Sequence, residues 1–262
     1  MTDDIKKILL QDRTTNKNII WASDDYENIS ATDEIKFEQI NLIKSRYEKI
    51  SALQKNRAKS KAEIFTPPEI CAIQNNSIET KTFWRDYINK KILEITCGEA
   101  PYLANRYNTI TGESIAIKNR AGILDRKLKV VGDITNNVDE WCYFAKKSVQ
   151  SVYGYEFHGD SLFIARKNIF ETVQDFFHEK FKFSPPIGFL KDIADFISWN
   201  LWQMDGLTYT IPFHKIKDKQ TDLGFEEKKE CDPCIIIMNW QEDKKNEPIV
   251  FKKLVESHEK KF

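Results

Sequence analysis

Three short apolar segments in the middle of the chain each end at a polar or glycine-bearing turn. They are residues 92–95, 151–157 and 200–207. The segments between them have apolar residues at helical spacing, and strands that alternate with helices normally form a parallel sheet. The pattern therefore predicts an α/β fold in which a ligand binds at the carboxyl ends of the strands.

The other apolar patterns predict helices and two extensions. Helical spacing predicts helices within residues 33–61, from Pro67 onward, and within residues 78–89, 120–131, 139–149, 161–177 and 189–197. The first 33 residues are mostly polar and predict a loosely packed arm. The tail is charged up to Lys229 and then has apolar runs at 235–240 and 249–255, which predict either a hairpin or a further piece of the sheet.

These patterns divide the chain into three parts. We expect an N-terminal extension with a basic helix over residues 1–61, an α/β domain over 62–213, and over 214–262 a charged tail that could form a β-hairpin. A Thr-Pro pair at Thr66 and Pro67 predicts a helix start, because threonine can cap a helix and proline loses no hydrogen bond in its first turn.

The composition excludes some classes of protein. Of 262 residues, 41% are hydrophobic and 31% charged, which is typical of a chain with a buried core. Its 40 basic and 40 acidic side chains cancel, so a surface for nucleic acid would have to be local. No apolar run is long enough to span a bilayer and the N-terminus lacks a signal-peptide core, so we expect a cytoplasmic protein with no membrane partner.

Two clusters allow alternative interpretations. Lys55, Arg57, Lys59 and Lys61 are either a solvated helix end or a strap that contacts phosphates. The chain has five cysteines, an odd number that favours reduced thiols over a disulfide framework. Cys231 and Cys234 form a single CxxC; structural thiols are the default, because zinc would need two more ligands, with only His214 and His258 in range.

The turn after the first predicted strand carries the most chemistry. In the segment 91–107, KILEITCGEAPYLANRY, Gly98 lets the backbone approach a ligand closely, and Glu94 lies at the strand end. Glu156 ends the second strand, where a carboxylate can accept both hydroxyls of a ribose or can cap a helix. Asp160 is a candidate cap for the helix that follows, and Asp205 ends the third strand.

The order of these elements resembles a known family. It comprises Phe65-Thr66-Pro67-Pro68-Glu69, then Leu93 to Leu103, then Tyr153-Gly154-Tyr155-Glu156 with Asp160 to Asn168, and finally Gln203-Met204-Asp205-Gly206-Leu207. This order is similar to that of the γ-class adenine-N6 DNA methyltransferases of restriction–modification systems. The match over roughly residues 55–213 resembles in particular bacterial proteins called restriction endonuclease subunit M.

The resemblance implies a Rossmann-like sheet, in whole or in part, that binds S-adenosylmethionine. Thr66, Pro67, Cys97 and Gly98 would lie along the methionine portion and Glu94 would hold its ammonium group; Glu156 would hold the ribose, Asp205 the adenine amino group, and Phe157 and Leu207 the adenine ring. The implied partners are double-stranded DNA and a second chain, which would supply a catalytic motif or be an endonuclease or specificity subunit.

The sequence departs from the family at two points. Gly98-Glu99-Ala100 replaces Gly-x-Gly, and a carboxylate at Glu99 beside Glu94 is expected to weaken cofactor affinity. The catalytic Asn-Pro-Pro-Tyr motif is absent, and its nearest counterpart is Asn239-Trp240 after an apolar run. We favour the interpretation that the chain ends before the motif, as a truncated or split chain would, over a degenerate catalytic loop at these two residues.

Two other functions compete with a methyltransferase. A non-catalytic protein with the same fold would bind DNA or a partner protein through its basic helix and tail. A nicotinamide-dependent enzyme is disfavoured, because the loop at Gly98 lacks three spaced glycines.

Overall fold

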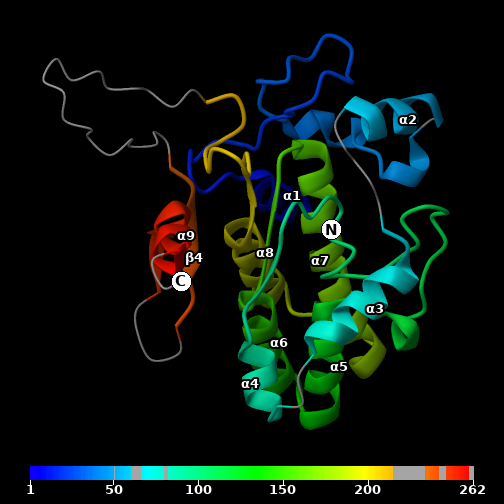
Figure 1. Cartoon of the computed structure of the whole chain (residues 1–262). Helices are drawn as coiled ribbons and strands as arrows, with labels where there is room; N and C mark the ends of the chain where they lie inside the picture. Colours follow the sequence, from blue (N-terminus) through cyan, green and yellow to red (C-terminus); the bar gives the residue numbers. More distant parts are fainter. Residues whose placement is uncertain (50, 61–65, 80–81, 215–233, 242–245, 260–262) are drawn as a thin grey trace, which may run out of the picture.

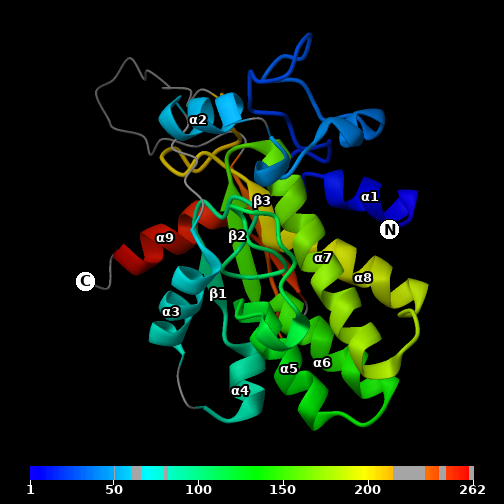
Figure 2. The ribbon, with the colours of Figure 1, turned by 90° about the vertical axis from the view of Figure 1, so that its right-hand side faces the viewer.

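A three-stranded parallel sheet lies at the centre of the fold. The computed structural model describes residues 1–49, 51–60, 66–79, 82–214, 234–241 and 246–259. Strands β1 (Ile92–Glu94), β2 (Val152–Glu156) and β3 (Leu201–Gln203) lie in the order β1-β2-β3, as Figure 2 shows. Leu93 pairs with Tyr153, and Tyr155 with Trp202. The predicted α/β class and the three predicted strands are therefore confirmed.

The connecting helices pack on one face of the sheet (Figure 1). Helices α5 (Ile123–Ile134) and α6 (Val138–Gln150) connect β1 to β2, and α7 (Gly159–Phe181) and α8 (Ile187–Asn200) connect β2 to β3. Parallel crossovers are right-handed, so successive strands laid down in one direction place their helices on the same face. In the resulting core the rings of Trp141 (α6) and Phe177 (α7) pack edge to face, with their centroids 5.2 Å apart.

A β-hairpin and a short helix cover part of the opposite face. Strands β4 (Ile236–Asn239) and β5 (Glu247–Val250) pair antiparallel, and α9 (Phe251–Glu259) follows directly. Trp202 of β3 packs against Phe251 at 5.1 Å in a second apolar cluster with Ile237. The antiparallel pairing agrees with the hairpin alternative of the sequence analysis. In the apolar run 249–255, however, only the first two residues belong to β5, and the rest begin α9.

The first 33 residues are well packed, so the prediction of a loose arm was wrong. Helix α1 (Asp3–Leu10) buries Ile5, Leu9 and Leu10 in the main core, and Trp21 is fully buried. The composition of this segment is polar on average, but its few apolar residues lie on one face of α1. Such a face is enough for an amphipathic helix to pack against the core.

Several predicted helices start or stop elsewhere. The described residues of the segment 33–61 form three short helices, η1 (Phe37–Leu42), η2 (Arg46–Glu48) and α2 (Ser51–Ser60), where we predicted one helix. The remaining short helices are α3 (Pro68–Ile78), α4 (Trp84–Asn89) and η3 (Ile117–Asn119). Pro67 is the N-cap of α3, and the predicted Thr66 cap does not form. Along the described ranges, no helix combines the length and apolar character needed to cross a membrane.

A buried ionic cluster fastens the N-terminal region to α7. The Asp160 carboxylate lies 2.9 Å from the Arg57 guanidinium and 3.1 Å from the Lys49 ammonium, and it accepts a hydrogen bond from Tyr26 Oη at 2.7 Å. Arg57 also pairs with Asp25 at 2.8 Å. Both interpretations of the basic strap were therefore wrong for Arg57, which points inward and is fully buried.

The cluster sets the charge state of Asp160. Burial alone would raise the pKa of this carboxyl, but the facing Lys49 and Arg57 outweigh burial and hold its pKa well below the ordinary value. A lowered pKa in the folded state stabilises the fold at pH values above the ordinary aspartate pKa of about 4, and this stabilisation is lost as the pH falls further. Asp160 is thus a structural carboxylate more than a helix cap.

We predict that Asp160→Asn lowers the free energy of unfolding by about 3–5 kcal/mol at pH 7, because the substitution removes a buried negative charge that two buried cations face. Urea unfolding measures the loss. Asp3→Asn, which breaks only the exposed pair with Lys6, is the control and should change stability by less than about 1 kcal/mol. Equal effects of the two substitutions would contradict a stabilising role for the cluster.

Candidate functional site

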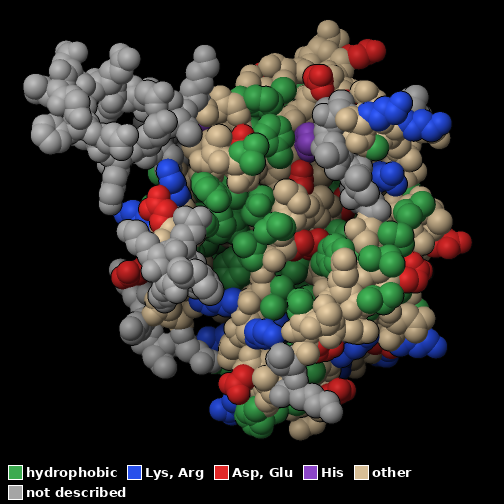
Figure 3. Space-filling model, viewed as in Figure 1, with side chains coloured by type: hydrophobic (Ala, Val, Ile, Leu, Met, Phe, Trp, Pro, Cys, Tyr) green, Lys and Arg blue, Asp and Glu red, His purple; other side chains and the backbone are tan. Residues whose placement is uncertain are grey.

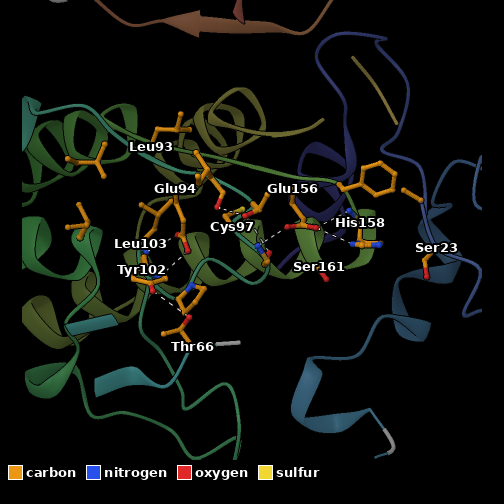
Figure 4. Close-up of a pocket in the computed structure, with 18 of the residues that line it drawn as sticks. Ser23, Thr66, Leu93, Glu94, Cys97, Tyr102, Leu103, Glu156, His158 and Ser161 are labelled. Atoms are coloured by element: carbon orange, nitrogen blue, oxygen red, sulfur yellow. Dashed lines mark hydrogen bonds and ion pairs between the residues drawn. The ribbon is translucent and has the colours of Figure 1, made fainter. Parts of the chain in front are cut away.

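A cavity of about 1140 Å³ opens at the carboxyl ends of β1 and β2 (Figure 4). The strand ends and the residues that follow them line it with Glu94, Cys97, Gly98, Glu156 and Phe157. Its other sides are lined by residues 22–24 of the N-terminal region, by Thr66, and by Phe213 in the loop after β3. Its position agrees with the general location of ligand sites in parallel sheets.

The turn after β1 is tightly curled. Gly98 and Ala100 have φ values of 55° and 59°, a left-handed conformation that favours glycine. The backbone N–H of Cys97 donates to Tyr155 O at 2.8 Å, and that of Ala100 donates to Cys97 O at 2.7 Å. These bonds fix the turn against β2 and place Gly98 at the cavity wall.

Glu156 joins the two strand ends. Its Oε2 accepts the Gly98 N–H at 2.9 Å, and its Oε1 accepts the His158 N–H at 3.1 Å and lies 3.2 Å from His158 Nδ1. The N-cap position of α7 is His158, so Glu156 is not the cap of that helix. A carboxylate has about four lone-pair sites, so Glu156 can still accept bonds from a ligand.

Glu94 is the second carboxylate of the cavity and differs from Asp160 in its surroundings. It accepts the backbone N–H groups of Tyr102 at 3.4 Å and Leu103 at 3.2 Å. Removal from water raises the pKa of Glu94 to about 8, the two backbone donors oppose this shift, and nearby Glu156 adds to it. Within the part of the chain that the structure describes, no Lys or Arg side chain forms an ion pair with Glu94, so a cationic group of a ligand would be its counter-charge and would favour the ionised carboxylate.

Cys97 is not poised as a nucleophile. Burial raises the pKa of its thiol well above the ordinary value, and Glu94 and Glu156 raise it further. Since the thiolate is the reactive form, this cysteine contributes packing and shape to the cavity wall.

Glu99 lies away from the cavity. It is almost fully buried and accepts hydrogen bonds from Tyr107 Oη at 2.6 Å and from the Arg46 N–H at 2.7 Å. Glu99 was expected to weaken cofactor affinity from a place beside Glu94, but its side chain is directed away from the cavity and bonded elsewhere. Its side chain links the turn to η2.

An aromatic pair forms one end of the cavity. The rings of Phe157 and Phe213 meet edge to face, with centroids 5.5 Å apart. Phe213 was not among the predicted site residues; it lies in the loop after β3 with a φ of 66°. No local pattern marks this residue. His158, Ser161 and Tyr102 line the same cavity and were not among the predicted site residues, and Lys59 of the predicted basic strap lines it too.

The structure brings together only part of the predicted site. Thr66, Glu94, Cys97, Gly98, Glu156 and Phe157 line the cavity, whereas Pro67, Asp205 and Leu207 are outside its described lining. The Asp205 carboxylate accepts the Leu207 N–H at 2.8 Å, closing its own turn, and the Leu207 side chain is 93% exposed.

Asn239 and Trp240 lie at the opposite end of the sheet. Asn239 Oδ1 accepts a hydrogen bond from Lys91 Nζ at 2.7 Å, just before β1, and Trp240 Nε1 donates to Asn200 Oδ1 at 2.7 Å, just before β3. The bridge between Cys234 and Thr210 fixes the start of this segment near the carboxyl end of β3, and β4 then runs toward the amino ends of β1 and β3. Asn239, the last residue of β4, is therefore far from the cavity.

The cysteines give a divided outcome. Cys71, Cys97 and Cys142 are free, as predicted, but Cys234 is disulfide-bonded, so the prediction of reduced thiols was wrong there. Cys231 lies outside the described residues. Among those that the structure describes, no group of three or more His, Cys, Asp or Glu side chains could hold a metal ion.

Comparisons of the chain with protein-family models, with curated proteins and with solved structures found no match.

We predict that Glu94→Gln changes how stability depends on pH. A raised carboxyl pKa in the folded state costs nothing below the unfolded value of about 4, and its cost grows as the pH rises toward 8. The wild-type chain should therefore lose about 4 kcal/mol more stability than the variant between pH 5 and pH 9, measured by urea unfolding. Glu113→Gln, at an exposed turn, is the control, and parallel curves for all three proteins would refute the raised pKa.

Proposed function

We propose that the chain is the S-adenosylmethionine-binding part of an adenine-N6 DNA methyltransferase from a restriction–modification system. The observation that carries the proposal is the meeting of Glu94, Gly98 and Glu156 at one cavity, at the carboxyl ends of adjacent parallel strands. A tight turn between two carboxylates suits a ligand that has both a cationic group and a pair of hydroxyls.

The residues present fit this cofactor. The cavity volume exceeds what a nucleoside-sized molecule requires. Glu94 would hold the ammonium group of the methionine portion, Glu156 the ribose hydroxyls through its remaining lone pairs, and Phe157 with Phe213 the adenine ring. Phe213 thus takes the place in the proposal that the resemblance gave to Leu207.

Bound S-adenosylmethionine supplies an activated methyl group, and the role of this chain is to bind and orient it. Positioning of that kind lowers the barrier to a direct transfer without a covalent enzyme intermediate. Neither Asn239 nor Trp240 lies where it could orient a target adenine beside this cavity. We therefore propose that a second chain supplies the catalytic motif.

We predict that S-adenosylmethionine binds the full chain in calorimetric titration and that Glu156→Gln weakens binding at least about tenfold, because hydrogen bonds to a charged group contribute about 1.5–3 kcal/mol. Glu113→Gln should bind as the wild type does. Absence of binding at millimolar cofactor would refute the proposal and favour a non-catalytic protein that binds DNA or a partner. Salt-dependent binding of duplex DNA by such a protein would support that alternative.

We also predict that the isolated chain transfers no methyl group to adenine in duplex DNA. The measurement uses cofactor with a labelled methyl group and a mixed-sequence duplex, and a known adenine methyltransferase confirms that the duplex can be modified. Transfer by the chain alone would show that a catalytic group lies elsewhere in this chain.

A further inference from the structure

A separate hollow lies away from the cavity at the strand ends. Hydrophobic side chains gather between α3 and the hairpin in Figure 3, where residues of α3 and β1 line that first cavity. The separate hollow has a volume of about 500 Å³ and shares no lining residue with the first cavity. It lies where α5 packs beside α6 and α7 (Figure 2), and we call it the α5–α7 hollow. A ligand there would be independent of the proposed cofactor.

The floor of the α5–α7 hollow is apolar. Phe176 of α7 and the half-buried Ile117 of η3 line it, together with Leu128 and Trp141 from the buried core. Gly132 of α5 also lines it, and a methyl group on its Cα would meet no atom within 4 Å beyond the adjacent helix backbone. Glycine destabilises a helix relative to alanine. The hollow is therefore open at a position where a side chain would both fit and stabilise the helix.

Two lysine ammonium groups border this floor. Lys129 Nζ donates to two backbone carbonyls in and just after η3, at 3.2 and 2.6 Å, and Lys180 Nζ donates to the carbonyls of Gly132 and Thr135. An ammonium group has three donors, so each lysine keeps one donor for a ligand. Within the described residues neither ammonium forms an ion pair with a carboxylate. An anion in the hollow would therefore supply a counter-charge that this part of the chain does not.

The charges around the hollow select the head group of a ligand. Its charged lining consists of three lysines, Lys118, Lys129 and Lys180, and two carboxylates, Asp133 and Glu179. This leaves an excess of one positive charge. A head group with one negative charge matches the excess, whereas a doubly charged phosphate would be repelled by the two carboxylates.

We propose that the α5–α7 hollow binds a small amphiphilic carboxylate, with the apolar body over Gly132 and the carboxylate at Lys129 and Lys180. Concave, largely apolar sites of about 300–1,000 Å³ with a few convergent polar groups are typical of small-molecule binding. The bonds of the two lysines to backbone carbonyls explain why their ammonium groups are held in place. Those bonds do not fill the open space over Gly132, and an apolar ligand body does.

The test is an NMR titration of the full chain with sodium octanoate in the absence of S-adenosylmethionine. We expect saturable shifts of the Gly132 and Lys180 amide signals with a dissociation constant of about 1 mM or lower, as is usual for a ligand of this size. Octylammonium has the same alkyl chain and the opposite charge. It should bind at least about tenfold more weakly, because it cannot accept a hydrogen bond from an ammonium group.

Two glycine variants separate the hollow from general affinity for amphiphiles. Gly132→Leu fills the hollow and should weaken octanoate binding at least about tenfold, because the alkyl chain can no longer be buried there. Gly188→Leu, at an exposed glycine of α8 that also has open space around it, is the matched control and should bind octanoate as the wild type does. Both variants should melt no lower than the wild type, because leucine is a better helix former than glycine.

A second pair of variants tests the head group. Lys180→Gln keeps a hydrogen-bond donor but removes the charge, and should weaken octanoate binding about fivefold. Lys167→Gln, at an exposed lysine of α7 outside the hollow, should leave binding unchanged. Absence of saturation at about 20 mM octanoate, or equal binding of octanoate and octylammonium, overturns the proposal. Octanoate shifts that Gly132→Leu leaves unchanged would also overturn it, because the ligand would then bind elsewhere.

Discussion

Parallel pairing of β1 with β2 is the constraint on which the rest of the structure depends. It aligns the carboxyl ends of two strands that are separated by about 60 residues of chain, so the Gly98 N–H meets the Glu156 carboxylate at 2.9 Å. That hydrogen bond fixes the turn, and the turn shapes the cavity. The same pairing places the connecting helices on one face and leaves β1 as an edge.

The carboxylates of Asp160 and Glu94 have different roles because they face different groups. Asp160 faces a guanidinium and an ammonium group, so its charge is neutralised inside the protein and holds the N-terminal region in place. Glu94 accepts backbone N–H groups and, within the described residues, faces no cation, so removal from water raises its pKa. A carboxylate without an internal cation beside an open cavity is the kind of group that proteins use to bind ligands.

Local patterns predicted much of the fold. Each strand was an apolar run closed by a turn, and α5 to α8 had apolar residues at helical spacing, so their existence and order were predictable. The boundaries of the helices were harder to predict, because tertiary contacts decide where a helix stops. One helix was predicted over residues 33–61, whereas the described residues of this segment form three. Helix α1 was not predicted because the segment is polar overall, and only three of its side chains are buried against the core.

By itself, the sequence determined the parallel α/β class and the residues at the ends of β1 and β2, since period and turn chemistry are local properties. Only the tertiary structure decided that Phe213 joins the cavity, that Glu99 and Arg57 turn inward, and that Asn239 lies at the far end of the sheet. Those outcomes depend on which distant segments pack together. A side chain's partners across the fold are set by the folded chain as a whole and not by its neighbours in sequence.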